Sequence, residues 1–371
     1  MGSTEGIGAE SATQDATMVA RLAGAGSAGA SSAVKLAQRL GLNYVATDAL
    51  TLRRQRRGTG FSYLTPAGRP IRDAATVQRL KGLAVPPAYA DVLYAEDPQA
   101  HLQAIGRDAA GRLQYRYHPE WQKVREMRKA SRLARFAEAL PRIRRSIGQH
   151  LGSGEPTREF ALACVIEMVA RSAIRPGSES YARMRGTRGA ATLLKSNVVV
   201  DGETVTLSFK AKGGKRVQKE FRAARLCIAI EMLRKLPGRR LFQYRAQSGD
   251  VRRVTAHDVN KFLREIAGAQ ISLKDFRTLL ASVQVLDALA REQPATSKRG
   301  RRRQVLEAIR AAAEDLANTP TICAKSYVHE SVVAAFEEGI LEQFAEALRN
   351  CRSGGRREKV LAQVIATAAA A

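Results

Sequence analysis

The sequence predicts an α+β protein in which a small N-terminal antiparallel β domain precedes a larger, mainly helical domain with a small three-stranded sheet. Between residues 44 and 122, short runs rich in Tyr, Phe, Val and Thr alternate with turn signals such as RRGTG and TPAGRP, which is typical of strands. One helix is expected there, near residues 73–83. From residue 123 onward, Leu, Ala and Ile recur at intervals of three to four residues, which predicts amphipathic helices. The 371 residues suffice for both domains.

Both ends of the chain differ in composition from these domains. Residues 1–43 contain the stretch AGAGSAGASSA and few large apolar side chains. Burial cannot then offset the entropy lost on ordering, so we expect a disordered tail. Residues 351–371 are basic and rich in alanine, and are expected to form a second tail. The helical domain is therefore expected at residues 123–350.

The first polar feature of the helical domain is Arg175, in the segment AIRPGSESYAR. A Pro-Gly pair usually just ends a helix, and an arginine beside it is usually solvated. Held at a rigid junction, however, the planar guanidinium can bind a phosphate through two hydrogen bonds.

Three strand-like segments interrupt the helical pattern: NVVV at 197–200, TVTLSFK at 204–210 and RVQKEF at 216–221. The Asp-Gly pair after the first and the AKGGK turn after the second predict a three-stranded meander. Lysines at such a turn often serve only solubility. Lys210 and Lys212 nevertheless share a face, and a flexible tip could carry one of them into a groove as a proton donor.

The segment at 271–292 is the clearest helix in the sequence. Ser272 and Asp275 have the spacing of a capping box, which fixes the helix start. Lys274 and Arg277 are neighbours on the first turn, where the positive end of the helix dipole disfavours cations. A bound anion would relieve this conflict. The following SKRGRRR at 297–303 is expected to be an exposed loop.

The segment at 317–331, ANTPTICAKSYVHES, contains a further helix start. Asn318 and Thr319 are capping candidates, and Pro320 suits the first helical position. A tyrosine such as Tyr327 on a helix is normally part of a core or an interface.

The charge balance indicates a polyanionic partner. The chain has 61 Lys and Arg against 35 Asp and Glu, a net charge of +26. A small anionic substrate needs far fewer positive charges, so nucleic acid is the leading partner. Four sparse cysteines favour a reducing compartment. We find no apolar run of membrane-spanning length and no secretory signal, so we expect a cytoplasmic protein with no membrane partner.

Common nucleotide machinery is missing from the sequence. There is no G-x-x-x-x-G-K-[ST] phosphate loop, no H-x-x-x-H, and no acidic cluster of the two-metal nuclease kind. We therefore expect no ATP requirement, no cofactor and no bound metal.

These motifs together resemble the type IB DNA topoisomerases of the small bacterial, poxvirus-like kind. The shared order is I-R-P-G, then F-x-x-K at a hairpin, K-D-x-R on a helix and N-T-P-x-x-x-x-K-x-Y. In the N-terminal region, GFSYLTPAGRPIRD, AVPPAY and GRDAAGRLQYRYHPEW look like the small β domain of that family. The resemblance covers roughly residues 44–345.

The resemblance implies a set of catalytic residues. Tyr327 would be the nucleophile, Arg175 and Arg277 the clamps on the scissile phosphate, and Lys212 the general acid. Asn318 would stand where other members have His. The family commonly has Gly before the lysine, whereas Ala211 stands here. Lys210 and Lys215 are close by, which leaves Lys210 as an alternative acid.

The resemblance also implies how DNA would be bound. DNA would be contacted by Lys274, Lys210 and Lys215. Lys274 stands where tyrosine recombinases usually have His. Gln114, Tyr115 and Tyr117 resemble residues that contact the groove. The expected protein is a monomer that closes as a clamp around duplex DNA and is associated with the nucleoid. The alternatives are a tyrosine recombinase, which Lys274 and the β domain disfavour, and a non-catalytic DNA-coating protein.

Overall fold

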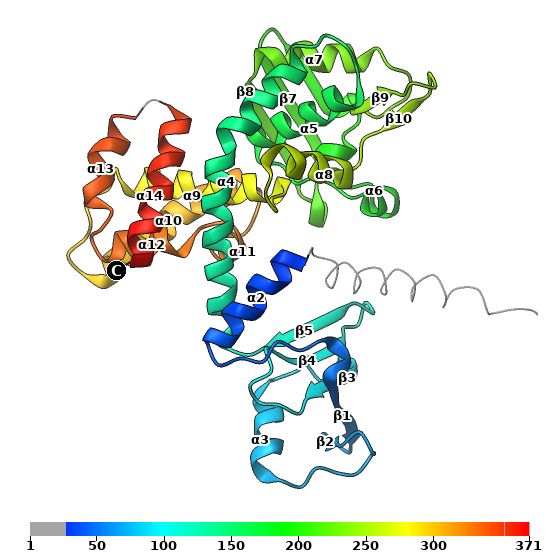
Figure 1. Cartoon of the computed structure of the whole chain (residues 1–371), viewed down its shortest axis with the longest axis vertical. Helices are drawn as coiled ribbons and strands as arrows, with labels where there is room; N and C mark the ends of the chain where they lie inside the picture. Colours follow the sequence, from blue (N-terminus) through cyan, green and yellow to red (C-terminus); the bar gives the residue numbers. More distant parts are fainter. Residues whose placement is uncertain (1–26, 352, 371) are drawn as a thin grey trace, which may run out of the picture. The chain divides into compact units, whose positions relative to one another are not determined.

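The computed structural model describes residues 27–351 and 353–370 (Figure 1). The chain divides into two compact units, the first ending at Arg128 and the second beginning at Lys129. In the described residues, no helix combines the length and the apolarity needed to cross a membrane.

The first unit contains a five-stranded antiparallel sheet in the order β2-β1-β3-β4-β5. Its strands are Leu50–Arg57 (β1), Gly60–Leu64 (β2), Ala90–Ala95 (β3), Leu102–Arg107 (β4) and Leu113–Tyr117 (β5). Helix α3, Ala74–Gly82, begins where the Asp73 carboxylate accepts the Thr76 amide. Leu80 of α3 packs against the sheet residues Leu52 and Tyr94. The predicted β domain and its one helix are thus confirmed.

The expected disordered tail is wrong for the part that the structure describes. Ser27–Arg39 form helix α2, while residues 1–26 lie outside the described residues. Ala33 and Ala37 of α2 are buried against Trp121 and Val124. Alanine has the highest helix propensity and lets two backbones approach closely, so an Ala-rich stretch can form a helix once a large aromatic partner covers it.

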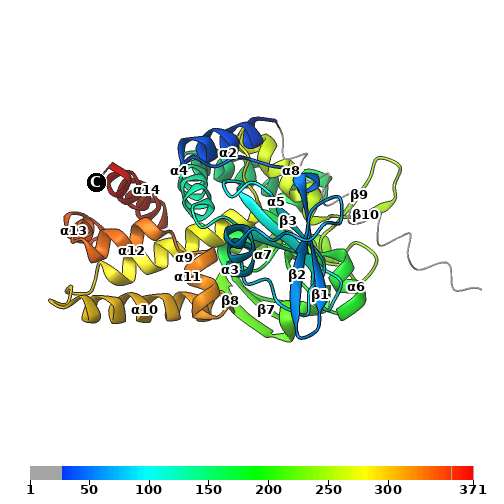
Figure 2. The ribbon, with the colours of Figure 1, turned by 90° about the horizontal axis from the view of Figure 1, so that it is seen from below.

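The second unit is mainly helical, as predicted. Its helices are Trp121–Leu151 (α4, which begins in the first unit), Arg158–Ser172 (α5), Glu179–Arg185 (α6), Ala224–Arg234 (α7), Ala256–Ala267 (α8), Leu273–Leu289 (α9), Lys298–Asp315 (α10), Pro320–Ser326 (α11), Glu330–Glu337 (α12), Glu342–Arg349 (α13) and Gly354–Ala370 (α14). Helices α5 and α9 are buried on most sides and form the centre of the core. Helix α10 runs alongside α9 (Figure 2). All four cysteines of the sequence are free, buried thiols in this unit.

The predicted meander is present. Strands β6 (Val198–Asp201), β7 (Thr204–Lys210) and β8 (Arg216–Arg222) form an antiparallel sheet in sequence order. A separate hairpin joins β9 (Gln243–Arg245) and β10 (Val251–Arg253). Inward residues of β7, such as Val205 and Leu207, are fully buried, whereas the turn after β7 is exposed. The sheet is therefore anchored at its base and open at its tip.

Two predictions about the end of the chain are wrong. Residues 297–303 are not a loop: the Ser297 hydroxyl accepts the Gly300 amide and starts α10. The C-terminal tail is also ordered, because α14 buries Leu361 and Val364 against the core. In both segments, the apolar residues at helical spacing stand among many charged residues or alanines, so the helical pattern is weak in the sequence.

Candidate active site

Two helices end in the same way beside the site. Helix α5 is followed by Ala173 and α10 by Leu316 and Ala317, and both alanines have left-handed backbones with φ of 53° and 50°. This conformation costs a non-glycine residue roughly 1–2 kcal/mol. Each turn redirects the chain just before a polar site residue: Arg175 stands two residues after Ala173, and Asn318 directly follows Ala317.

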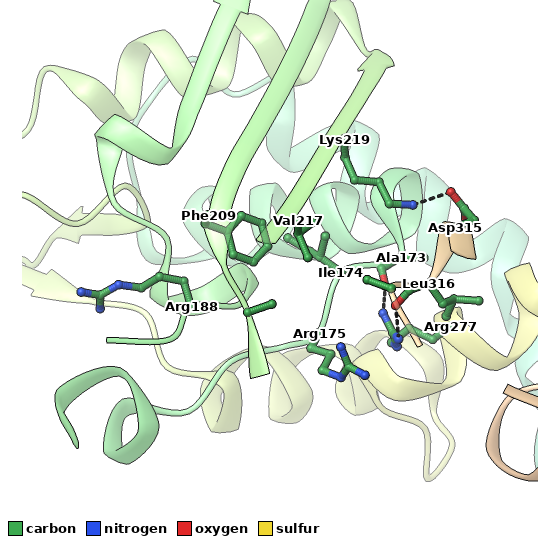
Figure 3. A pocket seen from close by; sticks show the side chains of 12 residues that line it. Ala173, Ile174, Arg175, Arg188, Phe209, Val217, Lys219, Arg277, Asp315 and Leu316 are labelled. Carbon is green, nitrogen blue, oxygen red and sulfur yellow. Dashed lines mark hydrogen bonds and ion pairs between the residues drawn. The ribbon is translucent and has the colours of Figure 1, made fainter. Parts of the chain in front are cut away.

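Arg277 ties these two turns together. Its guanidinium donates one hydrogen bond to the Ala173 carbonyl and another, of 3.1 Å, to the Leu316 carbonyl (Figure 3). The side chain is only 2% exposed. A buried cation needs such partners, so the first turn of α9 is fixed to the ends of α5 and α10.

The start of α9 is built as the sequence predicts. Ser272 and Asp275 form the capping box, with the Ser272 amide donating to the Asp275 carboxylate at 2.7 Å. Arg132 of α4 adds an ion pair of 2.8 Å to the same carboxylate. Lys274 remains exposed. The capping network therefore fixes the orientation of the turn that carries Lys274 and Arg277.

Tyr327 lies at the C-terminal end of α11 and is held through its backbone. Its amide donates a hydrogen bond to the Cys323 carbonyl oxygen at 2.9 Å. Its carbonyl accepts from the fully buried Ser282 hydroxyl at 3.2 Å, and the same hydroxyl accepts the His329 amide at 3.0 Å. Lys129 of α4 donates to the next carbonyl, that of Val328, at 2.6 Å. The backbone that carries the tyrosine ring is thus held by contacts from α4, α9 and α11.

The Tyr327 ring lies among cations. The Arg277 guanidinium carbon is 4.7 Å from the ring centroid, and the Lys274 ammonium is 5.9 Å from it. Burial raises the pKa of the phenol, but the charge and hydrogen bond of Arg277 and the charges of Arg175 and Lys274 outweigh it. The net effect lowers the pKa of Tyr327 below its usual value of 10. The environment therefore favours the phenolate, which is the nucleophilic form.

Arg175 and Asn318 are joined directly. The Arg175 guanidinium donates to the Asn318 side-chain oxygen. Because arginine can only donate, this bond turns the amide nitrogen of Asn318 the other way, and that nitrogen is buried with no partner in the described part of the chain. An acceptor such as a phosphate oxygen would satisfy it.

The hairpin tip carries the three lysines singled out in the sequence. Ala211 is buried and lines the same pocket as Arg175, Arg277 and Phe209, and Figure 3 shows those three side chains. Lys212 next to it is exposed, as are Lys210 and Lys215. Ala211 has an extended backbone with φ of −97°, so this position requires no glycine. The structure brings Arg175, Arg277, Asn318 and Tyr327 together and leaves Lys212 at the tip.

The sequence of the chain matches known proteins over both units. Residues 118–353 match the family model of the catalytic core of eukaryotic DNA topoisomerase I, and residues 60–108 match that of the N-terminal domain of bacterial DNA topoisomerase IB. The chain is 31% identical over 282 residues to a DNA topoisomerase 1B of Acanthamoeba polyphaga mimivirus. The matched region covers 74% of this chain and 84% of the viral protein. The chain belongs to the type IB DNA topoisomerases.

In this topoisomerase, the predicted groove-contacting residues lie on β5, an edge strand of the first unit. Tyr115 and Tyr117 are stacked, with ring centroids 6.2 Å apart, and Tyr117 is 40% exposed. Gln114 points to the opposite face and donates to the Asp108 carboxylate at 2.9 Å. The two tyrosines thus form a shared aromatic surface, and Gln114 belongs to a separate polar contact.

Sequence reasoning missed the residues that position the topoisomerase nucleophile. Lys129 and Val328 are 199 residues apart in the chain, and Ser282 and Tyr327 are 45 apart, so no local pattern connects them. Ser282 alone gave a signal, since it is a polar residue within the apolar stretch LLASVQVL. A buried hydroxyl requires hydrogen-bond partners, which here are the two backbone groups beside Tyr327.

Proposed function

We propose that this type IB topoisomerase relaxes supercoiled duplex DNA by cleaving one strand through Tyr327 and resealing it. The Tyr327 phenolate attacks the scissile phosphorus, and a 3′-phosphotyrosyl ester forms as the bond to the 5′ oxygen breaks. The broken strand rotates about its partner, and the 5′ hydroxyl then attacks the ester and releases Tyr327. One phosphodiester-type bond replaces another, so the reaction needs no ATP.

The observation that carries this proposal is the position of Tyr327 beside the Arg277 guanidinium, 4.7 Å from the ring centroid. The cation lowers the cost of forming the phenolate, as the lowered pKa of Tyr327 indicates. Arg175 and Arg277 would then stabilise the charge on the non-bridging oxygens of the pentacoordinate transition state, and the free Asn318 amide would donate to one of them. Fixed donors of this kind need little rearrangement during the reaction.

Lys212 is the residue that we assign as the general acid. The leaving 5′ alkoxide is a strong base and must be protonated as the bond breaks. An arginine retains its proton too firmly for this role, whereas the pKa of a lysine can be lowered by neighbouring cations. Lys212 is carried by a turn in which Gly213 and Gly214 both have left-handed backbones. Such a turn can move toward a bound phosphate.

We further propose that the protein acts as a monomer that closes around duplex DNA. The first unit would contact the groove through the aromatic surface of Tyr115 and Tyr117, and Lys210, Lys215 and Lys274 would contact the backbone near the cleaved bond. The net charge of +26 favours such wrapping, because each neutralised phosphate releases counterions. The expected location is the cytoplasm, in association with the nucleoid.

The experiment that tests this function is relaxation of supercoiled plasmid in EDTA without ATP. We expect both positive and negative supercoils to be relaxed. Tyr327→Phe removes one oxygen and no charge, so it should bind duplex DNA as the wild type does but form no covalent complex. A strict magnesium requirement, or action on negative supercoils alone, would contradict the proposal. Covalent attachment of the Phe variant to a 3′ DNA end would mean that another residue is the nucleophile.

A further inference from the structure

The loop that carries Arg175 lies directly on a second backbone segment. A Cβ atom added to Gly189 would lie 2.5 Å from both the Arg175 carbonyl oxygen and the Gly177 nitrogen. Gly189 has an extended backbone, with φ of −158°, so the glycine is required for space and not for its conformation. The two backbone segments could not approach this closely with any other residue at position 189.

Hydrogen bonds join the same two segments. The Ala190 amide donates to the Arg175 carbonyl at 2.8 Å, and the Ala191 amide donates to the Pro176 carbonyl at 2.9 Å. The Thr192 hydroxyl, which is 1% exposed, accepts the Gly189 amide at 2.9 Å and donates to the Gly189 carbonyl at 3.1 Å. Thr192 therefore fixes the shape of the segment on which Arg175 rests.

The other end of this segment holds the hairpin. The Arg188 amide donates to the Lys210 carbonyl at 2.7 Å, at the last residue of β7. The next residue, Ala211, donates its amide to the Lys215 carbonyl at 2.7 Å and closes the turn. A run of five residues, 188–192, thus contacts both the Arg175 loop and the base of the turn that carries Lys212.

We propose that residues 188–192 form a splint that sets the distance between the phosphate clamp and the general acid, and that Gly189 and Thr192 are positioning residues for strand cleavage. This inference rests on the proposed role of Lys212. The hairpin tip is otherwise exposed, and proton transfer requires the ammonium within hydrogen-bond reach of the 5′ oxygen. A displacement of about 1 Å between catalytic groups can cost on the order of 10²-fold in rate.

The test compares Thr192→Val with Thr192→Ser. Valine keeps the shape of the side chain but leaves the buried Gly189 amide without its acceptor, whereas serine keeps the hydroxyl. Single-turnover cleavage is measured on ordinary DNA and on DNA with a 5′-bridging phosphorothiolate, whose thiolate leaves without a proton. Thr206→Val makes the same chemical change on β7 and is the matched control. Duplex affinity and its salt dependence are measured for every variant.

We expect Thr192→Val to cleave ordinary DNA roughly 10–100-fold more slowly, in line with a misplaced catalytic group, and to lose much less on the thiolate substrate. Thr192→Ser and Thr206→Val should cleave as the wild type does, and all variants should bind DNA alike. Gly189→Ala, if it folds, should show a larger loss with the same partial rescue. Wild-type rates for Thr192→Val, or equal losses on both substrates, would overturn the splint.

The same assay separates failure of this inference from failure of the proposed function. If Lys212→Ala itself shows no preference for the thiolate substrate, the assignment of the acid is wrong. If Lys212→Ala is rescued and Thr192→Val is not, Lys212 is the acid and residues 188–192 do not position it.

Discussion

The guanidinium of Arg277 lies 4.7 Å from the centre of the Tyr327 ring and donates hydrogen bonds to the carbonyl oxygens of Ala173 and Leu316. One buried cation thus serves two purposes. It fixes the turns that precede Arg175 and Asn318, and it favours the phenolate of Tyr327. Loss of this side chain should affect both the folding stability and the pH dependence of cleavage.

Arg277→Gln should shift the pH dependence of cleavage to higher pH. Burial raises the pKa of Tyr327, and the cations lower it to a net value below 10, so removal of the strongest cation lets the pKa rise. The phenolate fraction at neutral pH then falls, and loss of transition-state stabilisation adds to this, for a total of about 10²–10³-fold in rate. Single-turnover cleavage between pH 6 and pH 10 measures the shift. Lys274→Gln, which removes the exposed and more distant cation, should shift the profile less. An unchanged profile for Arg277→Gln would contradict the assigned role.

Lys212→Ala should slow cleavage of ordinary DNA by about 10²–10⁴-fold, as expected for loss of a general acid. Cleavage of the 5′-bridging phosphorothiolate should remain close to wild type. Lys210→Ala and Lys215→Ala remove the same charge from the same turn and are the matched controls. If Lys210→Ala shows the rescue instead, Lys210 is the acid. Small and equal losses in all three variants would mean that the turn contributes charge alone.

Asn318→Asp should cleave at least about 10²-fold more slowly, the usual effect of losing a fixed donor to a developing oxyanion. The carboxylate can still accept from Arg175, as the amide oxygen does, but the donor to the phosphate is replaced by a negative charge. Asn318→His restores a donor and should lose less. Cleavage rates at saturating enzyme measure both effects. Equal rates for the Asp and His variants would show that the Asn318 nitrogen does not contact the phosphate.

His329 should make the protein less stable in mild acid. Burial, and then the charge of Lys129, lower the pKa of His329 from 6.5 to about 4. The unfolded chain therefore binds the proton between pH 6.5 and pH 4 while the folded chain does not, and the free energy of unfolding falls as the pH decreases through this range. By linkage the loss is up to about 3 kcal/mol.

Urea unfolding followed by circular dichroism, from pH 4.5 to pH 7.5, measures this slope. His329→Gln removes the titrating group and should flatten the pH dependence. His101, whose pKa burial also lowers to about 4, remains in the variant and leaves a residual slope. An identical pH dependence in wild type and variant would exclude His329 as the cause.

Local signals in the sequence predicted much of the framework of the site. The Ser272–Asp275 capping box and the turns of the meander involve residues close together in the chain, so spacing alone reveals them. The motif order also pointed to the four residues that the fold brings together. Their catalytic roles remain predictions.

What the sequence could not predict depends on contacts between distant segments. The close approach of Gly189 to the Arg175 loop, and the two carbonyls that Arg277 binds, require the packed chain. The Ala-rich stretch before residue 40 was predicted to be disordered because small side chains bury little area. Its helix packs against Trp121, which is far away in the sequence.

The four buried cysteines of the second unit make the protein a convenient object for spectroscopy. All four thiols are buried, and burial also raises the pKa of the Cys164 and Cys323 thiols. Alkylating dyes should therefore not react with the native cysteines in the folded state. A cysteine introduced in place of the exposed Lys215 could then carry the only fluorophore without removal of any native thiol. Energy transfer from that label to a dye on the DNA would report when the hairpin closes on its substrate.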